Sequence, residues 1–96
     1  MDRSTALQLL KEHRPALVDR FGVVRLALFG STARDTARPD SDVDVLVAFD
    51  GPATSERYFG LQFYLEDLLG RPVDLVTEKA LRERLRPYVE RDAIVV

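Results

Sequence analysis

Three aspartates lie where the sequence otherwise predicts apolar strands. Asp42 and Asp44 stand two residues apart at the start of the apolar run 43–49, so their side chains leave the same face of a strand. Asp74 interrupts a second apolar run, 72–77. Ionised carboxylates that converge repel one another and resist burial, so either one of them takes up a proton or a cation binds between them. The sequence therefore predicts a hard divalent cation such as Mg²⁺, held by carboxylate oxygens.

Each aspartate also has a simpler explanation. The chain contains ten Asp, so an Asp-x-Asp pair is expected about once by chance. Asp42 would serve equally well as a cap for the turn after Pro39, and Asp74 as a residue on an exposed strand edge or as an ion-pair partner of Arg71. Taken singly, none of the three establishes a metal site.

A glycine and a serine add a second kind of chemistry. Gly30 and Ser31 follow the apolar run 23–29 and precede a short predicted helix. Backbone N–H groups at such a turn point outward and can bind an anion such as phosphate, although an ordinary turn capped by Ser31 explains the same residues. The turn is not a P-loop, because the Lys-Ser/Thr ending is absent. Gly30-Ser31, Arg34 and then Ser41-Asp42-Val43-Asp44 together predict a phosphate cradle and metal-binding carboxylates in one cleft.

The elements that position these residues follow from apolar spacing and from Gly and Pro. A first helix begins with Ser4 or Thr5 as its cap and kinks at Pro15. The predicted order then continues as strand 23–29, brief helix 31–35, turn 38–41, strand 43–49, helix 55–69 stopped by Gly70, strand 72–77, helix 78–85, and a last strand or helix end at 93–96. The expected fold is one α+β domain over residues 1–96, a small mixed sheet with helices packed against it; the strand directions stay open.

Composition narrows the functional classes. With 96 residues, 46% apolar and 31% charged, the chain is expected to fold around one core. No apolar stretch is long enough for a membrane span and no signal peptide opens the chain, so a cytoplasmic protein without a membrane partner is expected. Zero Cys and the single His13 exclude thiolate and histidine-cluster metal sites. A net charge of −2 gives no general attraction to nucleic acid.

The helix 55–69 carries more apolar residues than one face needs. Its helical spacing already supplies a full apolar face without Phe59 and Phe63, which lie one turn apart. Exposed aromatic patches of this kind often mark protein interfaces, here with a partner protein or a second copy of the chain. The alternative is that the C-terminal helix covers both rings.

The combination of Gly30-Ser31 with Asp42-Val43-Asp44 resembles the signature of the nucleotidyltransferase superfamily related to DNA polymerase beta. Residues 21–49 are similar, almost residue by residue, to its minimal branch, the MNT proteins, which act as antitoxins beside a HEPN-domain toxin. Residues 68–76 are similar to the third-carboxylate segment of that branch. Asp35, where many members carry Gly after the Arg, and Asp92, where Glu is common, are minor departures that do not touch the predicted metal ligands.

The resemblance implies a role for each candidate residue. Asp42 and Asp44 would bind Mg²⁺, with two ions expected, and Asp74 would be a third ligand or the general base for an attacking hydroxyl. The implied nucleotide-binding residues are Gly30, Ser31, Arg34 and Ser41. For Arg34 two roles stay open: it supports the triphosphate, or it ties the loop to an acidic neighbour.

The same resemblance implies transfer of AMP from ATP to a tyrosine hydroxyl of a HEPN toxin, which silences the toxin. A protein acceptor suits the size, since small-molecule transferases usually need a further domain to hold their acceptor. One alternative is a binding module that neutralises its toxin by contact alone. Another is a small-molecule nucleotidyltransferase that works with a separate helical subunit.

Overall fold

The computed structural model describes residues 1–84 and 92–96 of the chain. The elements are α1 (Arg3–Phe21), β1 (Val23–Phe29), α2 (Gly30–Ala33), β2 (Val43–Phe49), α3 (Ser55–Leu69), β3 (Val73–Thr77), α4 (Glu78–Arg84) and β4 (Ile94–Val95). The predicted strands 23–29 and 43–49 and the predicted helix 55–69 are confirmed to the residue. In the described part of the chain, no helix is long and apolar enough to cross a membrane.

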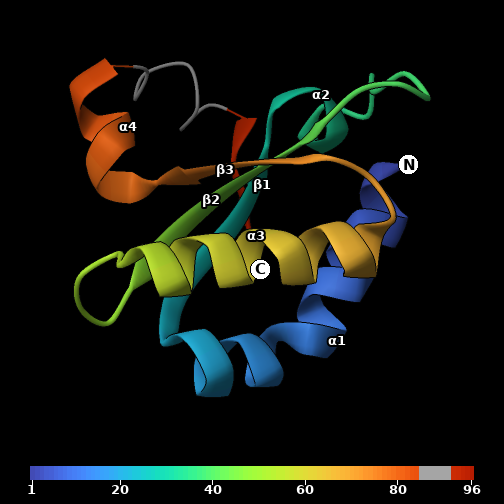
Figure 1. Cartoon of the computed structure of the whole chain (residues 1–96). Coiled ribbons are helices and arrows are strands. Elements are labelled where there is room, and N and C mark those ends of the chain that lie inside the picture. Colours follow the sequence, from blue (N-terminus) through green and yellow to red (C-terminus); the bar gives the residue numbers. More distant parts are fainter. Residues whose placement is uncertain (85–91) are drawn as a thin grey trace.

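The four strands form one mixed sheet in the order β3-β2-β1-β4. β1 pairs antiparallel with both β2 and β4, whereas β2 and β3 run parallel, joined by a crossover through α3 (Figure 1). The register places Asp44 opposite Phe29 on one side and opposite Asp74 on the other. The α+β prediction is therefore correct, and the structure supplies the strand directions that the sequence left open.

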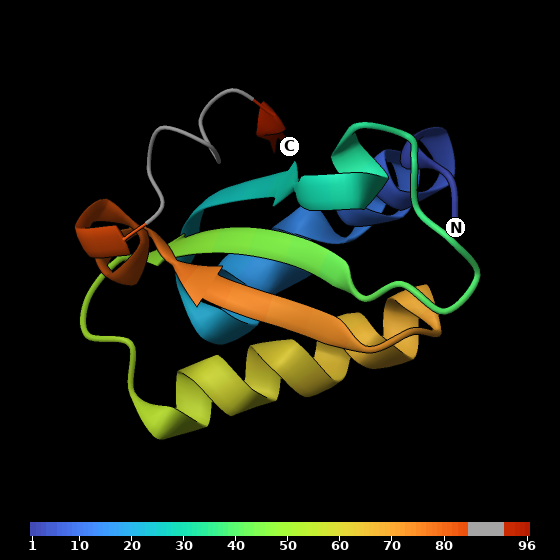
Figure 2. The ribbon, with the colours of Figure 1, turned by 90° about the horizontal axis from the view of Figure 1, so that it is seen from above.

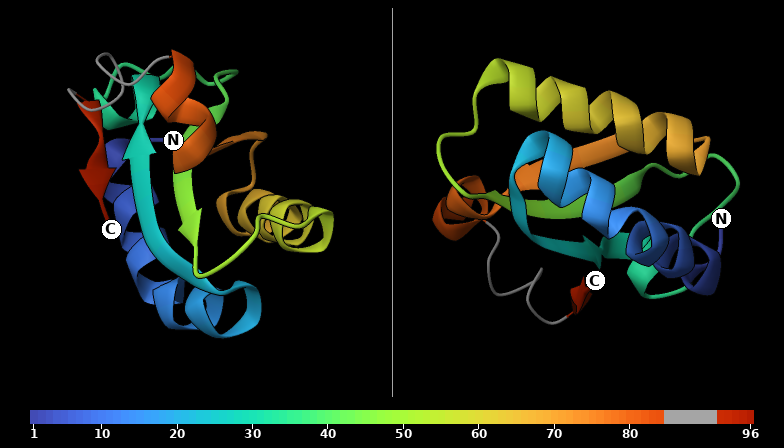
Figure 3. Two further views of the ribbon diagram at one scale, coloured as in Figure 1. Left: turned by 90° about the vertical axis from the view of Figure 1, so that its left-hand side faces the viewer. Right: turned by 90° about the horizontal axis from the view of Figure 1, so that it is seen from below.

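The two faces of the sheet are covered differently. Helices α1 and α3 lie side by side over one face (Figure 3) and bury the main core against it, with Leu10, Leu17, Leu61 and Leu65 fully enclosed. Between the two helices His13 Nδ1 lies 2.7 Å from the hydroxyl of Tyr64. The opposite face, seen from above in Figure 2, has α4 over only one end, where a smaller cluster forms from Ala27, Leu46 and Leu81.

The start of helix α1 differs from the prediction of Ser4 or Thr5 as its cap. Its N-cap is Asp2, whose carboxylate accepts a hydrogen bond of 2.7 Å from the backbone N–H of Thr5. An N-cap acceptor reaches an N–H two or three residues ahead, so Ser4 and Thr5 already lie inside the first turn. Pro15 lies within the helix, and Figure 1 shows the helix changing direction along its length, as predicted. The helix ends at Gly22, which has a positive φ of 70°.

Side chains of α3 cover the free edge of β3. Gln62 Nε2 donates to the carbonyl of Val73 at 3.1 Å, and the Val73 N–H donates to Glu66 Oε2 at 3.0 Å. The hydroxyl of Tyr58 donates to the carbonyl of Leu75. These three side chains follow one another at intervals of one helical turn. A single row of α3 therefore forms hydrogen bonds with backbone groups at the edge of β3, where another strand could otherwise pair.

The row of α3 beside that edge is left exposed. Phe59 is 50% and Phe63 is 63% exposed. Leu81 of α4 packs in the separate cluster on the opposite face of the sheet, so the alternative in which the C-terminal helix covers the two rings is wrong for its described residues.

Candidate active site

The three aspartates come together at one end of the sheet. Asp44 is the second residue of β2 and Asp74 the second residue of β3, and parallel pairing sets them in the same register. Both project from the face opposite α1 and α3, because their neighbours Val43, Val45 and Leu75 point into the main core. Asp42 immediately precedes β2. The same end receives the end of β1, where Gly30 begins α2.

Gly30 is required by the carboxylate beside it. Its φ is +70°, in the left-handed region, and a Cβ at this position would collide with Oδ2 of Asp44. The sequence identified Gly30 as part of a phosphate cradle. The structure adds a second reason for glycine: only a residue without a side chain lets the Asp44 carboxylate lie against the β1–α2 turn.

Burial and neighbouring negative charges act together on Asp44. Burial and then the negative charges of Asp74 and Asp42 raise the pKa of Asp44 from 3.8 to about 6, while the nearby charge of Arg34 acts in the opposite direction. The pKa shows that Asp44 lies within electrostatic reach of both other carboxylates. It also shows that Arg34 does not neutralise the group, so a bound cation would be favoured there.

The exposure of the aspartates corrects part of the sequence-based reasoning. Asp44 is half-buried, but Asp42 and Asp74 are exposed. β3 is an edge strand rather than a strand buried on both faces, so burial does not force a cation onto Asp74. Within residues 1–84 and 92–96, no group of three or more His, Cys, Asp or Glu side chains is gathered closely enough to hold a metal ion. The three-carboxylate Mg²⁺ site therefore stays a prediction.

The chemical type of the donor atoms nevertheless suits Mg²⁺. The donor set consists of carboxylate oxygens, the ligands that this hard cation prefers, and burial together with the charges of Asp74 and Asp42 raises the pKa of Asp44. A hollow of about 690 Å³ lies elsewhere, at the opposite ends of β2 and β3 beside Phe49, Pro52 and Lys79. None of the predicted site residues lines it.

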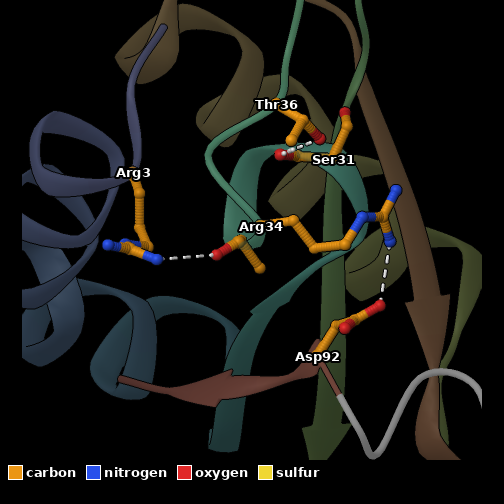
Figure 4. Close-up of polar contacts among 6 residues, drawn as sticks. Arg3, Ser31, Arg34, Thr36 and Asp92 are labelled. Carbon is orange, nitrogen blue, oxygen red and sulfur yellow. Dashed lines mark hydrogen bonds and ion pairs between the residues drawn. The ribbon is translucent and has the colours of Figure 1, made fainter.

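Ser31 lies within α2, and Arg34 is the C-cap of that helix. Phe29 is the N-cap of α2 and no side chain caps the helix, so the alternative in which Ser31 is an ordinary cap is wrong. The Ser31 carbonyl accepts from the backbone N–H of Thr36 at 2.9 Å. Arg34 Nη1 donates to Asp92 Oδ2 at 2.8 Å (Figure 4). The structure thus shows Arg34 tied to an acidic neighbour, one of its two predicted roles.

Ser41 lies in the turn that leads to Asp42. Its hydroxyl accepts from the backbone N–H of Arg38 at 2.9 Å, and its carbonyl accepts from Arg71 Nε at 3.2 Å. Arg71 therefore holds the loop before β2 instead of pairing with Asp74. Sequence reasoning missed this function of Arg71 and the partnership of Asp92, because both are contacts between segments far apart in the chain.

Gly30→Ala should destabilise the fold by about 2–3 kcal/mol, since the new methyl group meets Asp44 and the left-handed φ disfavours any side chain. Adding Asp44→Ala should recover about half of that loss, because it removes the colliding carboxylate and leaves the backbone strain. Urea unfolding of the two single variants and the double variant measures the coupling. Strictly additive effects would contradict the packing of Asp44 against Gly30.

The raised pKa of Asp44 predicts a pH dependence of stability. The native state holds the Asp44 proton more tightly than the unfolded state, so metal-free stability falls as pH rises from about 4 to 6. The Asp44→Asn variant should not lose stability over this pH range. After allowance for solvent screening, its free energy of unfolding should exceed that of the unchanged protein by about 1 kcal/mol at pH 7, and the two should be equal near pH 3.5. Unfolding with a chelator present at several pH values tests this. A large loss of stability in the variant would show that Asp44 has a structural role instead.

Comparison with known proteins agrees with this geometry. The model of the nucleotidyltransferase domain family matches residues 10–96. Protein adenylyltransferase MntA of Thermococcus cleftensis is 40% identical over 88 residues, 92% of this chain and 89% of that protein. A solved structure described as a "putative minimal nucleotidyltransferase" has a TM-score of 0.80 at 47% identity and covers 98% of this chain and 95% of that one.

A more distant structure shares the fold. It is the complex of a tri-AMPylated Shewanella oneidensis HEPN toxin with MNT antitoxin, with a TM-score of 0.60 at 20% identity, covering 97% of this chain and 66% of that one. The resemblance drawn from the Gly-Ser and Asp-x-Asp motifs is confirmed, and the chain belongs to the nucleotidyltransferase domain family.

Proposed function

We propose that this protein is a Mg²⁺-dependent nucleotidyltransferase that transfers AMP from ATP to a tyrosine hydroxyl of a cognate HEPN toxin and thereby acts as the antitoxin. The observation that carries the proposal is the placement of Asp44 beside Asp74 in the parallel register, with the Asp44 carboxylate against Gly30. A structural role does not require like charges to lie together, whereas a site for a cation and a triphosphate does.

Each residue of the candidate site has its own role in the proposed reaction. Asp42 and Asp44 would hold Mg²⁺, and the bound ion would supply positive charge against the α-phosphate and the leaving pyrophosphate. The Gly30-Ser31 turn faces the phosphates. The tyrosine oxygen attacks the α-phosphorus, the bond from phosphorus to the pyrophosphate oxygen breaks, and the phenolic proton passes to a carboxylate. Asp74 is exposed, and it either accepts this proton or completes the ligand set.

The exposure of Asp42 and Asp74 favours a protein acceptor. Asp42 and Asp74 are exposed, and α4 covers the other end of this face of the sheet (Figure 2). An acceptor must be held within about 3–3.5 Å of the reacting phosphorus to react efficiently. A partner protein can supply that positioning with its own surface. The MntA relative is named a protein adenylyltransferase, which supports the same class of acceptor.

Incubation with labelled ATP, Mg²⁺ and the product of the adjacent gene tests the proposal. Asp44→Asn should reduce label transfer at least 100-fold, because it removes one of the two main ligands, while Asp67→Asn, an exposed change on α3, should leave transfer unchanged. If the unchanged protein transfers no label to the partner, the proposal is contradicted. Normal transfer by Asp44→Asn would remove Asp44 from the mechanism.

A second candidate is neutralisation of the toxin by contact alone, and the exposed rings Phe59 and Phe63 favour it. The two functions are separable. If contact suffices, Asp44→Asn still protects cells from the toxin; if transfer is required, protection is lost although the complex still forms.

We also propose that Phe59 and Phe63 belong to the surface that binds the partner. Changing both to Ser should weaken the complex by about 2 kcal/mol, roughly 30-fold in Kd, and should change the stability of the free domain little, because both rings are exposed. Calorimetry with the partner measures the loss. The matched control changes the exposed Val18 and Val24 to Ser. Equal weakening by both double variants would contradict a specific role for the two rings.

A further inference from the structure

The ion pair between Arg34 and Asp92 joins the candidate site to the end of the chain. Arg34 follows α2, and Asp92 lies two residues before β4. Arg34 Nη1 and Asp92 Oδ2 are 2.8 Å apart, and Figure 4 shows the Arg34 side chain extending from α2 toward Asp92. The two residues are 58 positions apart in sequence, so only the fold brings them together.

Asp92 is the firmly held member of the pair. Its side chain is 24% exposed, against 50% for Arg34. The strand that follows it pairs with β1, the N–H of Val96 donates to the carbonyl of Leu26 at 2.9 Å, and Arg14 Nη1 donates to the carbonyl of Val96 at 2.8 Å. The sheet therefore fixes the position at which the carboxylate can receive Arg34.

The guanidinium retains donors beyond the one that binds Asp92. The guanidinium group of an arginine has five N–H bonds, and among the described residues the only hydrogen bond of the Arg34 guanidinium is the one from Nη1 to Asp92. A single contact on a half-exposed side chain leaves the remaining N–H groups for an anion, and planar guanidinium groups bind phosphate oxygens in pairs.

Asp44 is the competing partner for this guanidinium. Arg34 and Asp44 meet at Gly30: the backbone N–H of Arg34 donates to the Gly30 carbonyl at 3.1 Å, and Oδ2 of Asp44 lies where a Cβ of Gly30 would be. An Arg34 released from Asp92 would be drawn toward Asp44. It would then neutralise a carboxylate that the proposed reaction needs for its cation, and it would no longer offer its N–H groups to the nucleotide.

We propose that Asp92 is a positioning residue for nucleotide binding, which holds Arg34 by one nitrogen away from Asp44 so that the other N–H groups receive a phosphate of the nucleoside triphosphate. This inference rests on the proposed function, because it assigns Asp92 to the same site. Asp92 touches neither the nucleotide nor the acceptor and acts through Arg34 alone.

The test compares Asp92→Asn with Glu78→Gln. The control breaks the pair of Arg25 with Glu78, which is 2.9 Å long with side chains 60% and 24% exposed and so closely matches the other. Calorimetric titration with ATP and Mg²⁺ should show a five- to tenfold higher Kd for Asp92→Asn and an unchanged Kd for Glu78→Gln, at similar melting temperatures. In the transfer assay, Asp92→Asn should raise KM for ATP by the same factor and change kcat less than twofold.

Two further variants keep the proposal open to refutation. Asp92→Glu retains the carboxylate and should restore most of the affinity. If Asp92→Asn fails to fold, Arg34→Lys keeps the charge without the planar fork, and it too should raise the Kd at an unchanged melting temperature.

A Kd within twofold of the unchanged protein for Asp92→Asn, or for Arg34→Lys in its place, overturns the inference, and so does an equal rise for Glu78→Gln. ATP binding without transfer would overturn the proposed function alone, because the Kd values still decide the role of Asp92. No ATP binding by the unchanged protein would overturn both.

Discussion

The parallel register between β2 and β3 is the constraint on which the site depends. It sets Asp44 directly beside Asp74; burial first, and then the negative charges of Asp74 and Asp42, raise the pKa of Asp44 to about 6. In a small domain a repulsion of this kind is a sizeable share of the total stability. It is tolerated because the opposite face of the same strands makes the main core, with Val43, Val45 and Val47 all fully buried against α1 and α3.

Helix α3 serves more than the core, because its different rows of side chains face different parts of the domain. α3 performs three tasks with three rows of side chains: Leu61 and Leu65 fill the core, Gln62 and Glu66 satisfy the backbone edge of β3, and Phe59 and Phe63 are left on the surface. The edge contacts block strand addition at β3. A partner that binds this side of the domain must therefore use side chains, and the two phenylalanines are the large apolar groups that α3 exposes.

Local sequence signals predicted the elements well. The strands 23–29 and 43–49 and the helix ending at Gly70 agree with the structure, because apolar runs and left-handed glycines act over a few residues. The signal at the start of α1 was misassigned because Asp2, Ser4 and Thr5 are all acceptable caps and only the backbone geometry selects among them. Strand direction had no local signal, since it is set by how the crossover through α3 packs against the sheet.

The candidate site was predictable in its residues and not in its contacts. Asp42, Asp44 and Gly30 could be found because their types are unusual for their positions. Their environment could not: the exposure of Asp74 follows from β3 being an edge strand, a property of the whole sheet.

The contacts that organise the loops are long-range by nature. Arg71 reaches Ser41 across 30 residues and Arg34 reaches Asp92 across 58. A basic residue near an acidic one in sequence, as with Arg71 and Asp74, suggests a pair that the fold does not make.

These long-range contacts give the open site its order. Asp42 precedes β2 on a turn that Arg71 holds through the Ser41 carbonyl, and the β1–α2 turn is held through Arg34 by a residue next to β4. Neither arginine pairs with Asp44, since Arg71 binds a carbonyl and Arg34 binds Asp92. Among the described residues, Arg34 and Arg71 thus fix the loops around the aspartates, while no ion pair neutralises Asp42, Asp44 or Asp74, and the proposed binding of a cation and a triphosphate requires carboxylates that are free in this way.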